Sequence, residues 1–202
     1  MTAWIEMIPD DQASPQLQVA LNAARAPSGT VGNVMRVHSH RPSTMLGHVA
    51  LYKAVLHDNA NTVPEWFQET VASYVSLLNH CDYSFTNHWA NARHLIGDDA
   101  RADAMEQALR ELRPERAFDG LQLAMLAYAA KLTLTPGAMV EADVIGMRAL
   151  GADDGQILEI NQVCCYFNYA NRLLNGLGVT LQGDIIGYYV DETGAPTPKQ
   201  AG

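Results

Sequence analysis

Basic residues are scarce in this sequence. Its 202 residues include 13 Lys and Arg against 22 Asp and Glu, which gives a formal net charge of −9 at pH 7. No stretch gathers lysine and arginine into a cluster. Nucleic acids and anionic membranes are bound by basic surfaces, so the composition argues against both as partners.

Long apolar runs are also missing. None reaches the roughly 18 residues that a transmembrane helix needs, so we expect no membrane span. The segment MTAWIEMIPDDQ at the N-terminus lacks the basic-then-apolar order of a signal peptide. We therefore expect a cytoplasmic protein. An apolar content of 48% with 17% charged residues is normal for a globular chain and argues against disorder.

Cysteine is rare, with three residues, and no Cys-x-x-Cys pair occurs. An odd, small number of thiols suits a reducing compartment and predicts no disulfide framework. Cys164 and Cys165 lie amid core residue types and are expected to be packing residues. We expect no metal site and no cofactor.

Strand-type alternation is absent, whereas helix start and stop signals recur along the chain. Prolines, N-cap residues and terminal glycines bound segments whose apolar residues repeat at helical spacing. The sequence therefore predicts an all-α protein of about eight or nine helices. The expected helices cover residues 15–26, 42–57, 64–78, 81–96, 101–110, 118–132, 137–150 and 157–174.

Residues 69–95 contain the cluster of side chains that is the candidate catalytic site. Cys81, Ser84 and His88 are spaced i, i+3 and i+7, so one helix places them on one face. Asn79 is a favoured N-cap type, which predicts Cys81 in the first turn of that helix. Unpaired backbone N–H groups and the helix dipole favour a thiolate there. If its helix packs alongside, Glu69 is placed to orient His88 or to relay a proton.

This spacing resembles the alkylhydroperoxidase D and carboxymuconolactone decarboxylase family. Its redox members carry Glu, eleven residues, Cys-x-x-Cys, three residues and His. Glu69, Cys81, Ser84 and His88 fall at these positions, with serine in place of the second cysteine. In the resembling enzymes that second cysteine is usually given the peroxide-attacking role. A hydroxyl is not oxidised to a sulfenic acid, and Cys81 cannot form a disulfide with Ser84.

The resemblance extends beyond the motif. Residues 32–42 and 131–179 are similar to the N-terminal entry and the C-terminal half of the family's peroxidase-related branch. The resemblance implies an AhpD-like helical fold and a homo-oligomer, a dimer or a multiple of it. It also implies one domain at residues 1–190, with related halves at roughly 14–113 and 114–180, before a polar tail at 191–202.

Three functions stay open. The first, favoured by the weight of the family, is a peroxidase-like oxidoreductase in which Cys81 is the reactive thiol. A small hydroperoxide is then the suspected substrate and an external thiol the reductant. The second is a non-redox, decarboxylase-like enzyme with His88 as acid or base, Glu69 orienting it and Ser84 binding substrate. The third is an inactive homologue that binds a small molecule or a partner.

Three further residues are expected near the site. His80 and Tyr83 are predicted to line the mouth of the same pocket, and a turn position explains His80 equally well. Trp89 is predicted in the pocket wall or at a subunit contact, where a large aromatic ring contributes much contact area.

Overall fold

The computed structural model describes residues 1–197, and its regular elements there are all helical. The α-helices are α1 (Pro15–Ala23), α2 (Asn33–Arg36), α3 (Pro42–Leu56), α4 (Glu65–Leu78), α5 (Asp82–Ile96), α6 (Asp99–Arg110), α7 (Gly120–Leu134), α8 (Glu141–Ala149) and α9 (Asp154–Gly176). Short 3-10 helices are η1 (Asp10–Gln12), η2 (Pro114–Arg116) and η3 (Pro136–Ala138). The all-α prediction is confirmed.

Capping residues fix several helix ends where the sequence predicts them. The Ser14 hydroxyl accepts a hydrogen bond from the Leu17 backbone N–H at the start of α1. Asp153 and Gln156 form a capping box at the start of α9. Gly97 ends α5 in the left-handed conformation, with φ of 64°, which glycine adopts without steric cost.

The helix predicted at residues 137–150 is shorter than expected. Gly137 lies in η3, and Met139 and Val140 are extended, so α8 begins only at Glu141. The Asp143 carboxylate accepts a hydrogen bond from the Val140 backbone N–H, which satisfies a donor at this helix start.

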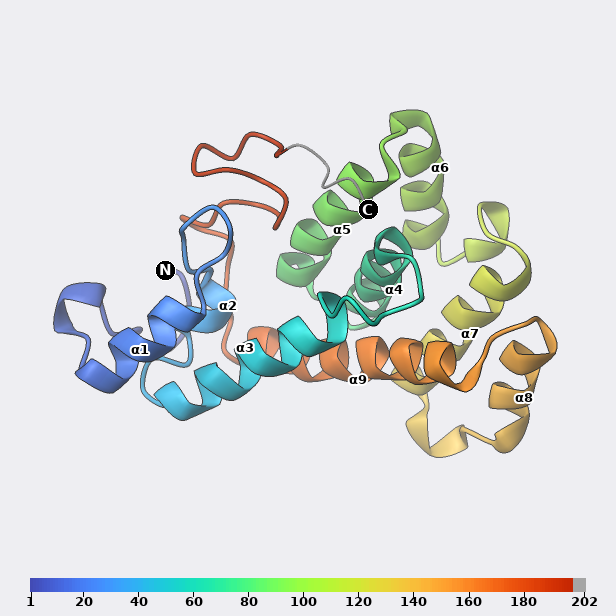
Figure 1. Cartoon of the computed structure of the whole chain (residues 1–202), viewed down its shortest axis with the longest axis horizontal. Coiled ribbons are helices and arrows are strands. Elements are labelled where there is room, and N and C mark those ends of the chain that lie inside the picture. Colours follow the sequence, from blue (N-terminus) through green and yellow to red (C-terminus); the bar gives the residue numbers. More distant parts are fainter. Residues whose placement is uncertain (198–202) are drawn as a thin grey trace.

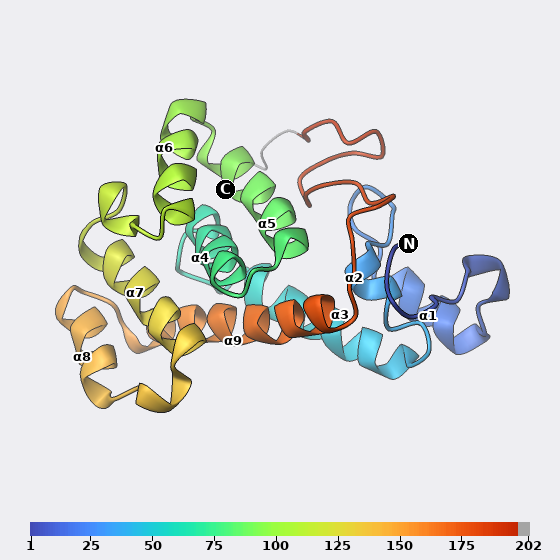
Figure 2. The same ribbon diagram turned by 180° about the vertical axis from the view of Figure 1, so that it is seen from behind.

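Helix α4 is the centre of the molecule. Its residues from Phe67 to Ser76 are all buried, and it packs against α5, α7 and α9. Figures 1 and 2 show α9 running along one side of the molecule, with α4 and α5 packed against it and α3 beside it. Glu69 lies on this central helix and is fully buried. A buried carboxylate is costly unless other groups hydrogen-bond to it.

The N-terminal residues meet the segment that directly follows α9. The Thr180 backbone N–H donates to the Thr2 carbonyl, and Trp4 donates to the Leu177 carbonyl. Residues after α9 then run back past α2 toward α5 (Figure 1). Of the tail predicted at 191–202, residues 198–202 lie outside the described residues; in the described part, Val190 and Pro196 form an isolated β-bridge.

Within residues 1–197, no helix combines the length and the apolar character that a membrane crossing requires.

Candidate functional site

The turn between α4 and α5 differs from the prediction. Asn79 is the C-cap of α4 rather than the N-cap of α5, and His80 is left-handed with φ of 53°. The backbone N–H groups of Cys81 and His80 donate to the Ser76 and Leu77 carbonyls, a Schellman motif. Cys81 is the last residue of this motif and also the N-cap of α5.

Cys81 lacks the thiolate-favouring environment that the sequence predicts for it. It is 2% exposed and packs in a cluster with Ala3, Leu174 and Val179. Burial raises the pKa of the thiol, although hydrogen bonds from the Ser84 backbone and the Asn171 amide act in the opposite direction. The tertiary contacts therefore outweigh the effect of the helix start.

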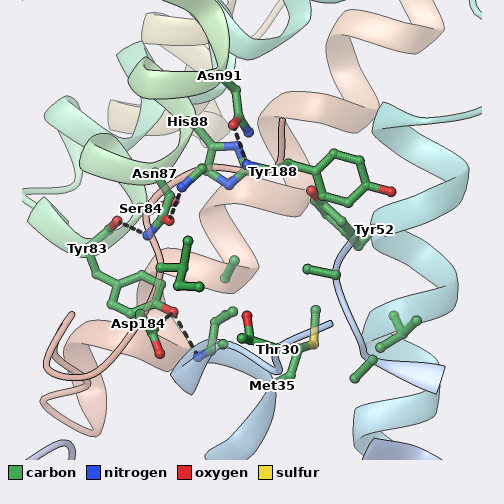
Figure 3. A pocket seen from close by; sticks show the side chains of 18 of the residues that line it. Thr30, Met35, Tyr52, Tyr83, Ser84, Asn87, His88, Asn91, Asp184 and Tyr188 are labelled. Atoms are coloured by element: carbon green, nitrogen blue, oxygen red, sulfur yellow. Dashed lines mark hydrogen bonds between the residues drawn. The ribbon is translucent and has the colours of Figure 1, made fainter. Parts of the chain in front are cut away.

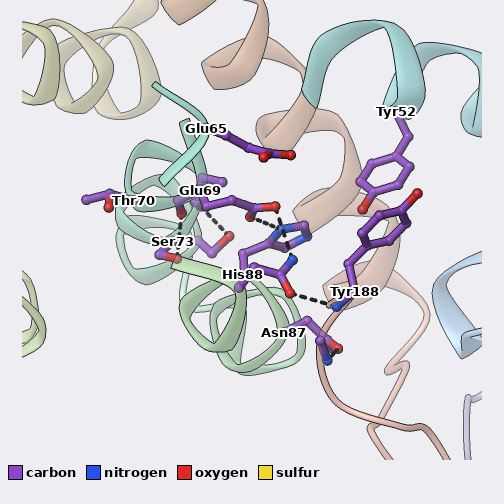
Figure 4. A network of polar contacts seen from close by, with 12 residues as sticks. Tyr52, Glu65, Glu69, Thr70, Ser73, Asn87, His88 and Tyr188 are labelled. Carbon is purple, nitrogen blue, oxygen red and sulfur yellow. Dashed lines mark hydrogen bonds and ion pairs between the residues drawn. The ribbon is translucent and has the colours of Figure 1, made fainter. Parts of the chain in front are cut away.

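The expected contact between Glu69 and His88 is present. Glu69 is fully buried, and its Oε2 accepts a 2.6 Å hydrogen bond from His88 Nδ1. Its Oε1 accepts from the Asn91 amide at 3.1 Å. Both carboxylate oxygens are therefore satisfied, as Figure 4 shows for the His88 contact. The bond to Nδ1 orients the imidazole and leaves Nε2 available for chemistry.

A cavity of about 130 Å³ lies beside this pair. Ser84 and His88 line it from α5, and Tyr52 lines it from α3 (Figure 3). The floor and walls are largely apolar and aromatic. Other lining residues include Val34, Met35, Val49, Tyr83, Asn87, Asn91, Tyr166, Phe167, Ala170, Leu174, Asp184, Ile185 and Tyr188. Such a mixture, with few polar groups at fixed points, is typical of small-molecule sites.

The predicted site residues thus divide into two groups. Ser84, His88 and Tyr83 line the cavity, whereas Cys81 does not. Trp89 is buried in the main core, stacked on Phe85, and lies outside the lining. His80 is exposed in the turn between the two helices and does not line the cavity.

Residues 184–190, which we call the closing segment, complete the cavity and were not predicted as part of it. The Gly187 backbone N–H donates to Asn87 Oδ1 at 3.1 Å, and that of Tyr188 donates to Asn91 Oδ1 at 2.7 Å. The Tyr83 hydroxyl donates to Asp184 at 2.5 Å. Asn91 therefore joins the buried Glu69 to the segment that covers the cavity.

Two buried histidines, which were not predicted near the site, support another wall of the cavity. His48 Nε2 lies 2.8 Å from the Tyr166 hydroxyl, and His48 Nδ1 lies 2.9 Å from His38 Nε2. The Thr44 hydroxyl donates to the Arg41 carbonyl, so its oxygen accepts from His38 Nδ1. His38 Nε2 must then accept from His48 Nδ1–H, and His48 Nε2 accepts from the Tyr166 hydroxyl. This arrangement keeps both imidazoles neutral and satisfied.

We expect this histidine pair to make stability depend on pH. Burial, with neighbouring His38, lowers the pKa of His48 from 6.5 to about 4. The unfolded chain therefore binds a proton more readily, and stability present above pH 6.5 is lost as the pH falls toward 4. The contribution at stake is about 3 kcal/mol.

Urea unfolding of wild type and His48→Gln between pH 7.5 and 4.5 measures this effect. The wild type should lose stability more steeply than the variant over that interval, because the variant lacks the titrating imidazole. Parallel stability curves would show that His48 titrates in the folded protein as it does in the unfolded chain.

No protein-family model matches the sequence. A search of curated proteins also finds no match. Solved structures do match.

An AhpD-core, peroxidase-related protein of Ralstonia eutropha JMP134 has 20% identity and a TM-score of 0.77, over 89% of this chain and 92% of that one. A peroxidase-related protein of Silicibacter sp. TM1040 has 24% identity and a TM-score of 0.76, over 89% and 91%.

The debrominase Bmp8, solved as a cysteine-to-alanine variant with 2,3,4-tribromopyrrole, has a similar structure. It has 15% identity and a TM-score of 0.70, over 88% of this chain and 90% of that chain. At identities this low, the similarity shows that the helices are arranged alike, and it does not show that the proteins catalyse the same reaction. The chain has the helical fold of the AhpD-like, peroxidase-related proteins.

Proposed function

We propose that this chain is a non-redox enzyme that moves a proton on a small carbonyl compound, such as a keto acid or a lactone. His88 is its acid and base. The observation that carries the proposal is the 2.6 Å bond from His88 Nδ1 to the fully buried Glu69, beside a cavity that His88 lines. A carboxylate that holds one ring nitrogen leaves the other to exchange protons with a ligand.

The proton-transfer step follows from these positions. His88 Nε2 takes a proton from the carbon next to the carbonyl, and the electron pair of the broken C–H bond moves into the carbonyl group to form an enolate. The imidazolium then returns the proton to carbon. Glu69 stabilises the imidazolium. The Ser84 hydroxyl, one helical turn before His88, binds the substrate.

A second candidate is thiol chemistry at Cys81; peroxidase-related proteins and a debrominase have similar folds. It is favoured by the position of Cys81 in the family spacing. A hydroperoxide would then oxidise the Cys81 thiolate to a sulfenic acid, and an external thiol would reduce it. The burial and raised pKa of Cys81 argue against it as the main activity.

Two assays on the wild type separate the candidates. In D₂O, ¹H NMR follows loss of the α-hydrogens of 2-oxobutanoate and isomerisation of the unsaturated lactone α-angelica lactone. We expect acceleration of at least one reaction, and no consumption of cumene hydroperoxide with dithiothreitol. Peroxide consumption that disappears in Cys81→Ser, with neither proton-transfer reaction accelerated, would replace this proposal by the thiol candidate.

Thiol labelling gives an independent prediction. All three cysteines are free, and Cys165 is the exposed one. We expect iodoacetamide to label Cys165 first, with Cys81 and Cys164 labelled at an appreciable rate only after unfolding. Burial blocks access to both, and it raises the pKa of Cys164 to about 11. Peptide mass spectrometry of timed samples measures each rate; equal rates at Cys81 and Cys165 would contradict the structure.

A further inference from the structure

A second histidine–carboxylate pair lies on the same side of α4 as the first. His57 Nδ1 lies 3.3 Å from Glu65 Oε1, and Glu65 precedes Glu69 by one helical turn. Figure 4 shows both carboxylates projecting from α4 toward His88 and Tyr52. The hydrogen bond with His57 lowers the pKa of Glu65, and the Tyr189 hydroxyl contributes in the same direction.

This second pair supports a tyrosine that lines the cavity. His57 Nε2 lies 2.9 Å from the Tyr52 hydroxyl, and Tyr52 lines the cavity with His88. The rings of Tyr52 and His88 have centroids 6.5 Å apart. Tyr188 of the closing segment stacks on His57 at 4.3 Å and covers the pair. A substrate in the cavity therefore meets two polar groups. One is His88, which Glu69 holds, and the other is Tyr52, which contacts His57.

We infer that Tyr52 is a second catalytic residue, which donates its hydroxyl hydrogen to the oxygen of an enolisable carbonyl substrate while His88 removes hydrogen from carbon. The inference rests on the proposed function and adds to it the group that recognises the substrate oxygen. His57 and Glu65 are positioning residues that act through Tyr52.

The hydrogen bonds that link Glu65, His57 and Tyr52 allow two states that differ by one proton. With His57 protonated on both nitrogens, Nδ1–H donates to Glu65 and Nε2–H donates to the Tyr52 oxygen. The Tyr52 hydrogen is then free to face the substrate. With His57 neutral, Nδ1–H still donates to Glu65, and the Tyr52 hydroxyl donates to Nε2. When an oxyanion binds and takes the Tyr52 hydrogen bond, Nε2 gains a proton from solvent and the first state forms.

The reaction step is balanced between these states. His88 Nε2 gains a proton from the substrate carbon, and the C–H electron pair forms the C=C bond of an enol. The carbonyl oxygen takes the Tyr52 hydrogen, the Tyr52 oxygen takes the hydrogen of His57 Nε2, and the imidazolium becomes imidazole. Ketonisation reverses each transfer and restores both residues, so no oxidant or reductant is needed.

Burial, together with the nearby Glu69 carboxylate, raises the pKa of Tyr52. The phenol therefore keeps its proton at neutral pH and can act as a hydrogen-bond donor to an oxyanion.

A binding experiment tests Tyr52 without requiring turnover. The probes are 4-nitrophenolate, whose oxyanion imitates an enolate, and the similarly shaped 4-nitrotoluene, both titrated at pH 8.5. Tyr52→Phe should weaken the binding of 4-nitrophenolate about tenfold or more and change that of 4-nitrotoluene less than about twofold, as expected for loss of a bond to a charged group. Tyr74→Phe is the matched control, since Tyr74 is buried on α4 and lies outside the cavity lining.

Turnover supplies the second readout. In the exchange assay, Tyr52→Phe should lower kcat about a hundredfold with little change in KM, and Glu65→Gln should lower kcat by a smaller factor. If Tyr52→Phe binds both probes like the wild type, the inference is overturned, whatever the activity. If the wild type shows no exchange while Tyr52→Phe still weakens the binding of 4-nitrophenolate alone, the proposed function fails and the donor role of Tyr52 stands.

Discussion

Replacement of His88 by alanine is expected to lower kcat/KM for the proton-transfer reaction about a thousandfold, within the range measured for positioned acid–base groups. Glu69→Gln should cost nearly as much. The amide offers an N–H to Nδ1, so the neutral ring then carries its hydrogen on Nε2 and loses its basic site. Both effects arise because Glu69 and His88 act as one unit.

The double variant distinguishes a shared role from two separate ones. Steady-state kinetics of wild type, both single variants and the double variant should show a double loss no larger than that of His88→Ala alone. Ser73→Ala, one turn from Glu69 and also buried on α4, controls for disturbance of that helix. Retention of a tenth or more of the wild-type rate by His88→Ala would remove His88 from the chemistry.

Phe67→Ala is expected to destabilise the protein by about 3–5 kcal/mol. Phe67 is 1% exposed, on the central helix α4, and its ring contacts Trp66 and Phe118 at centroid distances of 5.5 and 6.3 Å. Truncation leaves a cavity between α4 and its neighbours, which the surrounding helices cannot close without losing other contacts.

Urea unfolding followed by circular dichroism measures this loss. Val19→Ala is a suitable control because Val19 is 62% exposed on α1 and should change stability by less than about 0.5 kcal/mol. A loss below about 1 kcal/mol for Phe67→Ala would mean that α4 is not the packing centre of the fold.

The helices and the Glu69–His88 contact could be predicted because their signals are local. Caps such as Ser14 and Gly97 lie next to the ends they determine. Glu69 and His88 are 19 residues apart on consecutive helices joined by a tight turn, so regular helix geometry and antiparallel packing suffice to bring them together.

The remaining parts of the site depend on contacts between distant segments. His48 and Tyr166 are 118 residues apart, and Asn91 meets the closing segment across 97 residues. Cys81 loses the environment predicted for a helix start because Ala3, near the N-terminus, and Val179, just after α9, pack in one cluster with it. Side-chain spacing within one helix contains no information about such contacts.

The central claim is that His88, and not Cys81, performs the chemistry of this cavity. The most direct measurement compares kcat/KM of Cys81→Ala and His88→Ala in the same exchange assay, with the fold of each variant checked by circular dichroism. We expect Cys81→Ala to keep the wild-type rate within about threefold and His88→Ala to lose about a thousandfold. A loss of activity in Cys81→Ala, with His88→Ala still active, would contradict the account and assign the reaction to the thiol.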